Sequence, residues 1–350
     1  MNWKSLFAQK KSGKRKPRTK SRRLARTLAV SITVALALWG WVATWFVHHP
    51  RQWLEEKSSS LPRFVTHALY ALGNPIGDLT DALDWTGHDA VYEYDMEAPS
   101  GSILFAGAPQ RTGLPAPADI RVLNRGEFLI GWSDQLRHPV WCAYHVPRDV
   151  RFNDLKRPGF VKDRAVPVAP SPSAYTKSGY DRGHMVPNHA IATRFGEINQ
   201  KLTFMMSNIA PQTPALNRGV WRDVEHRIAD LWTSRFGEIW VIVGALSTSP
   251  SGLKIGPTGI DVPTAYYQII IAQEGLDVRA LAILLPQDIH WHAWAARHII
   301  TIDELEKLTG LDFNPELPSF IQSPLEADLP TRLWPIRPLD IFKLIALRFQ

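Results

Sequence analysis

Cysteine is almost absent from this sequence, because Cys142 is the only one among 350 residues. A disulfide within the chain is therefore excluded, and so is a zinc site built from several cysteine thiolates. The composition, with 45% hydrophobic and 21% charged residues, is typical of a globular protein and not of a disordered one. The length suits one large domain with appendages, or two domains.

Acidic residues are missing from the first thirty positions, which hold eleven of the 40 Lys and Arg. The formal charge of the whole chain is +7, and subtracting these eleven charges leaves −4 for residues 31–350. The positive charge therefore belongs to the N-terminal tail, and the body of the protein is mildly acidic. Such a tail binds either nucleic acid or anionic lipid headgroups, and the apolar run that follows it favours lipid.

Charge is also absent from residues 27–47, a run long enough for a helix that crosses a bilayer. Trp39, Trp41 and Trp45 lie toward its C-terminal end, where indole rings favour the membrane interface. Many cations precede the run and few follow it, which predicts a cytoplasmic N-terminus and a periplasmic or extracellular remainder. A signal peptide cleaved near Ala37 is the alternative. Because the apolar run continues beyond that residue, we favour a single-pass anchor in the inner or plasma membrane.

Composition divides the chain into five parts. We expect a basic cytoplasmic tail at 1–26, a transmembrane helix at 27–47, a stalk and linker at 48–119, a folded domain at 120–320 and a C-terminal extension at 321–350. The final residues have an amphipathic pattern, which predicts a short helix that docks on the domain or on the bilayer, and we favour the domain.

The residues of the domain predict an α+β fold. Apolar, β-rich runs bounded by Gly, Pro or Asp predict strands at 140–146, 239–246, 265–272 and 278–285. Helical periodicity predicts helices at 214–236 and 303–308. Since helices do not regularly follow strands, we expect a mixed or antiparallel sheet flanked by helices rather than a doubly wound one.

Two polar segments carry the candidate chemistry. Residues 181–184 read Asp-Arg-Gly-His, although a single histidine is more often structural than catalytic. Residues 206–212 (MSNIAPQ) lead into the predicted helix at 214–236. On that helix Asn217, Trp221 and Glu225 follow at intervals of four, so the Asn and the Glu share one stripe. An exposed helix face explains this stripe equally well.

Residues 180–188, 207–212 and 216–225 together resemble the DNA/RNA non-specific endonuclease family, whose signature is the Asp-Arg-Gly-His quartet. A looser resemblance extends from about Phe128 to Leu317. It implies a hydrolase with the ββα-metal (His-Me finger) nuclease fold, in which a mixed or antiparallel central sheet is flanked by helices. Here one transmembrane helix would precede that fold. It also implies DNA and RNA as substrates, cleaved regardless of the sugar to leave 5′-phosphate ends.

The resemblance implies a role for each motif residue. His184 would be the general base that deprotonates the attacking water, a role that neutral imidazole suits. Asn217 would be the one direct protein ligand of Mg²⁺, with Mn²⁺ as a substitute, and Glu225 would hold metal-bound water. Arg182 would pair with the phosphate, and Asn208 would help to organise the site.

Phosphate binding needs local cations, which the mildly acidic body must supply near the motifs. The candidates for such a patch are Arg182, Arg194, Lys201, Arg218, Arg222 and Arg227. Some family members carry a further arginine one turn after the position of Glu225, where this chain has Ala229. Five other polar residues are interpreted as surface or structural residues: Asp181, His189, His226, His290 and His292.

Two other classes of function stay open at this point. One is a catalytically silent nucleic-acid-binding protein of the same fold, and the other is a phosphodiesterase that acts on a substrate other than nucleic acid. A homodimer is also left open, because oligomeric state is not readable from these motifs. DNA binding without cleavage would indicate the silent protein, and a competition assay against small diesters separates the other phosphodiesterase.

Overall fold

A computed structural model describes residues 65, 88–94, 98–153, 155–247, 252–337, 340 and 343. The chain divides into two units, Met1–Gly77 and Asp78–Gln350, and every element below belongs to the second. The expected basic tail and transmembrane helix lie outside the described residues, as does nearly all of the expected C-terminal helix. Among the described residues, no helix is both long and apolar enough to cross a bilayer.

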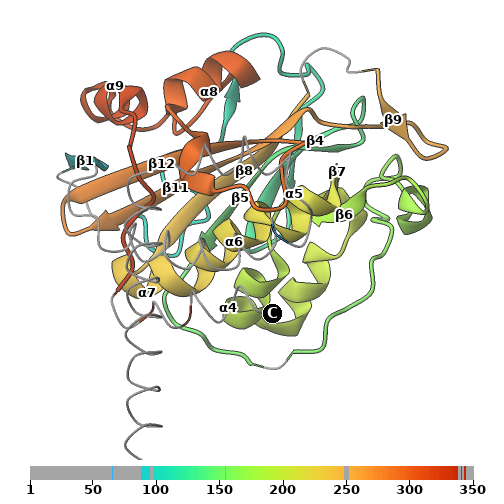
Figure 1. Cartoon of the computed structure of the whole chain (residues 1–350), viewed down its shortest axis with the longest axis horizontal. Helices are drawn as coiled ribbons and strands as arrows, with labels where there is room; N and C mark the ends of the chain where they lie inside the picture. Colours follow the sequence, from blue (N-terminus) through green and yellow to red (C-terminus); the bar gives the residue numbers. More distant parts are fainter. Residues whose placement is uncertain are drawn as a thin grey trace, which may run out of the picture. The chain divides into compact units, whose positions relative to one another are not determined.

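A large antiparallel sheet forms the centre of the second unit (Figure 1). Its order is β1-β12-β11-β8-β5-β4-β3, and the short strand β13 also pairs with β12. The strands are β1 (Ala90–Glu93), β3 (Arg121–Asn124), β4 (Phe128–Ser133), β5 (His138–Val146), β8 (Ile239–Leu246), β11 (Ala265–Glu274), β12 (Asp277–Pro286) and β13 (Ile299–Ile300). The four predicted strands are confirmed as β5, β8, β11 and β12, and the expected antiparallel character is confirmed as well.

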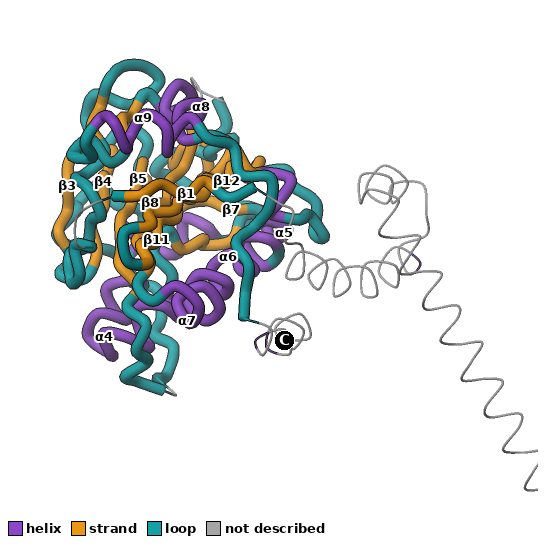
Figure 2. Tube along the Cα trace, turned by 90° about the vertical axis from the view of Figure 1, so that its left-hand side faces the viewer, coloured by secondary structure: helices purple, strands orange, loops and turns teal. Residues whose placement is uncertain are grey.

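The long central strands are apolar at nearly every position because both faces of the sheet are covered. Side chains alternate between the faces along β11, so that Tyr266 and Ile270 enter one core while Tyr267 and Ile269 enter the other. In Figure 2 helices lie on both sides of the strands. α4 (Asn188–Thr203) and the helical segments within 214–236 cover the first face, and α8 (Ile302–Thr309) and α9 (Ser319–Ala327) cover the second.

The prediction of one continuous helix at 214–236 is wrong. The segment consists of α5 (Pro214–Arg218), α6 (Val220–His226), a π-helical stretch (Arg227–Trp232) and α7 (Thr233–Phe236). The break lies at Gly219, where a Cβ atom would come 2.3 Å from the carbonyl oxygen of Ala215. The stripe expected from four-residue spacing is therefore interrupted between Asn217 and Glu225. The other predicted helix, at 303–308, is confirmed within α8.

Short elements complete the unit. Pairs of strands form between β6 (Asp181–His184) and β7 (Ile209–Gln212), between β9 (Lys254–Ile255) and β10 (Ile260–Asp261), and between β2 (Gln110–Arg111) and β14 (Leu311–Asp312). Single turns of 3₁₀ helix occur at Pro172–Tyr175, Met206–Asn208 and Ala295–His298.

The segments that flank the predicted domain are part of its fold, which differs from the interpretation as a linker and an extension. In the expected linker, β1 pairs with β12, and Ala106 and Ala116 are buried. In the expected extension, the indole of Trp334 packs on Trp232 at 5.4 Å between ring centroids. Apart from the short strands and α9, these segments cover the core with irregular backbone, which gives no repeating pattern in the sequence.

Candidate active site

The site is built on the β6–β7 ribbon and the helices that follow β7. The two strands are antiparallel, with His184 opposite Ile209 and Asp181 opposite Gln212. Position 183 accepts only glycine, because a Cβ atom there would lie 2.2 Å from the amide oxygen of Gln212. Thr213 then caps α5, with its hydroxyl accepting from the backbone N–H of Leu216. Two strands and a helix thus bring the DRGH motif next to Asn217.

A cleft of about 520 Å³ opens beside this ribbon. It is lined by Arg157, Phe160, Asp181, Arg182, His184, Asn188, His189, Asn217, Arg218, Arg222, Glu225 and His226. Four of the five predicted site residues are among them, namely Arg182, His184, Asn217 and Glu225. The fold therefore brings the motif segments, which are separate in sequence, to one concave surface.

His184 packs against two aromatic rings at the wall of this cleft, and these two rings also contact each other. Its ring centroid lies 5.3 Å from that of Phe160 and 4.8 Å from that of Phe204. Its Nε2 atom is buried and has no hydrogen-bond partner among the described residues. Burial, with a contribution from the positive charge of Arg157, lowers the pKa of His184 to about 3. The imidazole is therefore neutral at physiological pH, the state in which one ring nitrogen accepts a proton.

Asn217 is oriented by Asp181 from the ribbon. Its Nδ2 donates to Asp181 Oδ2 at 3.0 Å, while the Nε and Nη2 of Arg218 donate to the same carboxylate at 2.7 and 2.6 Å. Burial opposes ionisation of Asp181, but the hydrogen bonds from Arg218 and Asn217 outweigh it and hold its pKa below the usual value. With its amide nitrogen held, Asn217 has its carbonyl oxygen left to bind a ligand in the cleft.

Glu225 is anchored by the core. Its Oε1 accepts from the indole Nε1 of Trp221 at 2.9 Å, and that indole is itself buried against Tyr266. Burial raises the pKa of Glu225 to about 7, although His226, Trp221 and the nearby arginines oppose the shift. A buried carboxyl of this kind is stabilised in its ionised form by an added cation.

The oxygen donors of the cleft suit a hard cation. Besides Asn217 and Glu225 they include Asn188, whose Oδ1 is buried and has no partner in the described part of the chain. Amide and carboxylate oxygens are the ligands that Mg²⁺ accepts, usually while it retains several waters. The residues present therefore fit a hydrated Mg²⁺. Asn188 follows the DRGH motif by only four positions, but its residue type alone gave no signal for this role.

Asn208, which was expected to help organise the site, does not line the cleft. The side chain is fully buried, and its Oδ1 accepts from the backbone N–H of Val186 at 3.0 Å. Its Nδ2 donates to the carbonyl oxygens of Val186 and Thr203, both at 2.9 Å. Asn208 thus holds the backbone two residues after His184 and is a positioning residue.

The predicted cationic patch is only half correct. Arg182, Arg218 and Arg222 line the cleft. Arg194 and Arg227 are buried instead: the first donates to the carbonyl oxygen of Ala229, and the second donates to Asp223 at 3.1 Å. Lys201 forms an exposed ion pair with Glu197.

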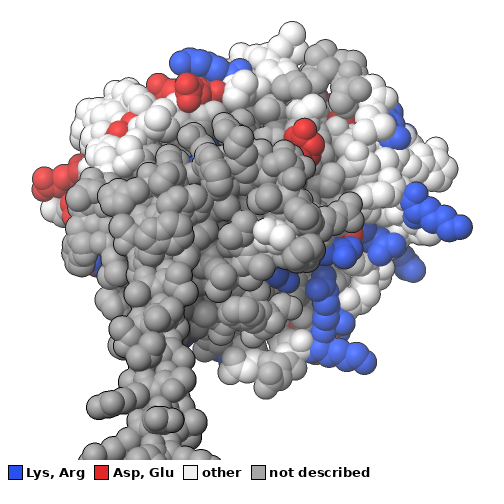
Figure 3. All heavy atoms as spheres, in the orientation of Figure 1, with Lys and Arg blue, Asp and Glu red and all other residues white. Residues whose placement is uncertain are grey.

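Arg157 is a cleft residue that the sequence pattern did not reveal. It comes from the irregular connection after β5, and its guanidinium lies 5.3 Å from the ring centroid of Phe204. The guanidinium of Arg182 lies 5.3 Å from the ring centroid of Phe160, while its Nε donates to Pro172 O at 3.0 Å. Figure 3 shows that basic side chains gather on the side of the molecule where β6 lies, and that acidic ones lie mainly toward α8 and α9. The local charge of the cleft is therefore positive in a mildly acidic body.

Comparison with known proteins gives consistent results. A model of the DNA/RNA non-specific endonuclease family matches residues 106–320. A nuclease of Nostoc sp. is 28% identical over 244 residues, covering 66% of this chain and 87% of that protein. Human mitochondrial endonuclease G is 25% identical over 228 residues, covering 60% of this chain and 74% of that protein. A crystal structure of an EndoG/EndoGI complex matches with a TM-score of 0.51 at 23% identity, covering 56% of this chain and 86% of that one, and so shares the fold.

Proposed function

Since the chain belongs to the DNA/RNA non-specific endonuclease family, and is a hydrolase of that class, we propose that its cleft cleaves both DNA and RNA in a Mg²⁺-dependent reaction that leaves 5′-phosphate ends. One observation carries the proposal. A neutral histidine and an amide with a free carbonyl oxygen line the same cleft as several arginines, namely His184, Asn217 and the guanidinium groups around them.

His184 is assigned the proton transfer. It takes a proton from a water molecule, and the oxygen of that water attacks phosphorus. The bond from phosphorus to the 3′ oxygen then breaks, so the phosphate remains on the 5′ side. The lowered pKa of the free enzyme ensures that the ring is unprotonated when substrate arrives. A bound phosphate brings negative charge near Arg157 and His184, which raises the basicity of the ring when it is needed.

The other residues hold the substrate and the cation. Asn217 would be the direct ligand of the Mg²⁺ and Glu225 would hold water of its shell, and the placement of both residues in the cleft supports these roles. When bound, the Mg²⁺ supplies stabilisation of the charge that develops on the phosphate and on the leaving oxygen. Arg182 and Arg157 extend into the same cleft, where a guanidinium pairs with two phosphate oxygens. Asp181 fixes which end of the Asn217 amide faces the ligand.

Membrane anchoring is a separate part of the proposal and rests on the sequence. Residues 27–47 would hold the protein in the inner or plasma membrane, with the nuclease domain periplasmic or extracellular. Fractionation of cells that express the full chain, followed by protease treatment from the outside, tests both location and orientation. Loss of membrane association after deletion of residues 27–47 would support the anchor. The mass of the detergent-solubilised chain decides between a monomer and a homodimer.

The activity is tested with the purified full chain in detergent. Supercoiled plasmid and a long RNA are incubated with Mg²⁺, with Mg²⁺ plus chelator, and with His184→Ala and Asn217→Ala variants. We expect cleavage of both substrates, loss with chelator and loss in both variants. His290→Ala, which changes an exposed histidine that does not line the cleft, is the matched control and keeps activity. Binding without cleavage would instead favour a silent protein, and selective cleavage of small diesters would favour a different phosphodiesterase.

A further inference from the structure

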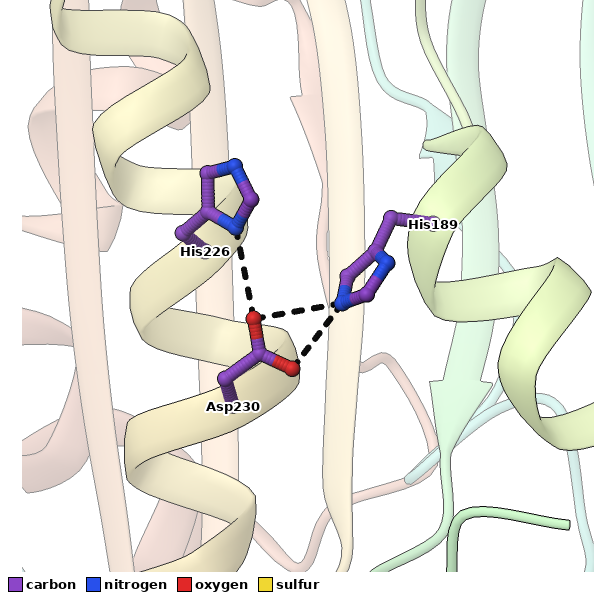
Figure 4. A group of neighbouring side chains, drawn as sticks. All are labelled: His189, His226 and Asp230. Carbon is purple, nitrogen blue, oxygen red and sulfur yellow. Dashed lines mark hydrogen bonds and ion pairs between the residues drawn. The ribbon is translucent and has the colours of Figure 1, made fainter. Parts of the chain in front are cut away.

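Three metal-binding side chains lie together at the edge of the cleft (Figure 4). His189 is the second residue of α4, His226 is the last residue of α6, and Asp230 lies one turn further in the π-helical stretch. One nitrogen of each ring and one carboxylate oxygen all lie within 4.8 Å of one another. Both histidines were expected to be surface or structural residues, but they converge on a single carboxylate.

The distances from the imidazole nitrogens to the carboxylate are close to those between ligands around one ion. His189 Nε2 lies 2.9 and 3.2 Å from the two oxygens of Asp230, and His226 Nδ1 lies 3.3 Å from Asp230 Oδ2. In a tetrahedral zinc site with bonds of about 2.0–2.1 Å, neighbouring ligand atoms are about 3.3 Å apart. A cation can therefore replace the two shared protons once the two ring nitrogens, which lie within 4.8 Å of each other, approach to that distance.

The donor set indicates the class of metal. Two imidazole nitrogens and one carboxylate oxygen suit zinc and similar borderline transition metals, whereas Mg²⁺ prefers oxygen donors alone. Two neutral imidazoles and one carboxylate carry a net charge of −1, which favours a cation.

The position of the cluster gives the ion access from solvent and a place to act. His189 and His226 both line the cleft, while Asp230 does not. His189 is exposed and the other two are half-buried. A zinc ion with three protein ligands keeps a fourth position for water or substrate. Here the imidazoles that would hold the ion form part of the wall that faces the cleft.

We propose that His189, His226 and Asp230 form a second metal site, separate from the Asn217 site, that takes Zn²⁺ or a similar transition metal. A consequence, which rests on the proposed nuclease function, is that the ion's open position binds a phosphate of the nucleic acid strand lying in the cleft.

Binding is tested with Co²⁺ as a spectroscopic probe and with Zn²⁺ as its competitor, on the full chain in detergent. We expect visible Co²⁺ absorption typical of four-coordinate geometry at one ion per chain, and its displacement by Zn²⁺. His189→Gln and His226→Gln should each weaken binding by at least about 100-fold, because each removes a direct ligand. Asp230→Asn should weaken it as well. The exposed His189 makes the first variant safe for folding, so it decides the question if the others unfold.

Matched controls separate this site from the catalytic one. Asn217→Ala and His290→Ala should leave the Co²⁺ spectrum unchanged. Loss of the spectrum in Asn217→Ala, or its persistence in His189→Gln, would overturn the proposed site. These readouts do not need nuclease activity, so they stand whether or not the chain cleaves nucleic acid. The phosphate contact is tested in the His184→Ala background, where equimolar Zn²⁺ should tighten DNA binding several-fold. In the double variant that also carries His189→Gln, Zn²⁺ should leave DNA binding unchanged. Unchanged DNA binding in the single variant would overturn the consequence alone.

Discussion

Substituting Asp181 with asparagine tests the orientation of the proposed metal ligand directly. The carboxylate accepts from Asn217 at 3.0 Å and from two nitrogens of Arg218. An asparagine at this position has one acceptor oxygen instead of two and presents an NH₂ group of its own. Since it cannot satisfy all three donors, the Asn217 amide loses the partner that fixes its direction. We therefore expect the carbonyl oxygen of Asn217 to face the ion for only part of the time.

The structure bounds the size of the effect. Loss of a residue that orients a metal ligand lowers metal affinity about 10- to 100-fold, which corresponds to about 1.4–2.8 kcal/mol. The stability effect should be smaller, because the Arg218 side chain is 61% exposed and such surface pairs contribute at most about 1 kcal/mol. Asp181→Asn should thus shift the Mg²⁺ concentration for half-maximal activity by one to two orders of magnitude, while saturating Mg²⁺ restores most of the rate.

The assay measures initial rates of plasmid cleavage across a Mg²⁺ titration, alongside urea unfolding without metal. Arg218→Gln is the matched control, because it removes the ion pair but leaves the bond between Asp181 and Asn217. We expect the control to keep the half-saturation point of the wild type. If Asp181→Asn keeps that point too, or if both variants shift it equally, then Asp181 does not act by orienting the amide.

Three further outcomes are expected. Asn208→Ala leaves three buried backbone groups of Val186 and Thr203 unpaired, so the free energy of unfolding in urea should fall by about 2–5 kcal/mol. The control is Asn199→Ala at a half-buried position, which should cost less than about 1 kcal/mol. Equal losses in the two variants would contradict this account. Burial, with the neighbouring carboxylates of Glu306, Asp312 and Asp303, raises the pKa of Glu326 to about 9, so wild-type stability should decline as pH rises from the acid range through 9. Glu326→Gln, which cannot ionise, should exceed the wild type in stability at pH 9 by several kcal/mol and converge with it at about pH 4, below the pKa of the unfolded state; a pH-independent difference in stability would count against the buried charge. Arg157→Ala, measured in the His184→Ala background, should weaken DNA binding and lower the slope of log affinity against log salt by about one, whereas an unchanged slope would remove Arg157 from the phosphate contacts.

The sequence was sufficient to predict the long strands and the motif residues of the candidate site. β8 and β11 could be predicted because a strand buried on both faces needs an apolar side chain at nearly every position, and that run is visible in the sequence. The DRGH segment and the Asn217 and Glu225 positions were predicted as one site through the resemblance to the endonuclease family, and the cleft is lined by Asp181, Arg182, His184, Asn217 and Glu225. Short edge strands such as β1 and β3 carry too few residues to stand out from loops.

Tertiary packing decided which polar side chains face the cleft. Arg194 and Arg157 have the same chemistry, but one guanidinium is buried against a backbone carbonyl while the other reaches the site from an irregular loop. Asn208 and Asn217 likewise differ only in direction, since the first turns inward to hold Val186 and the second turns toward the cleft. His189 and His226 meet on one carboxylate from separate helices. The direction of a side chain depends on neighbours that are distant in sequence, so residue type and spacing carry no record of it.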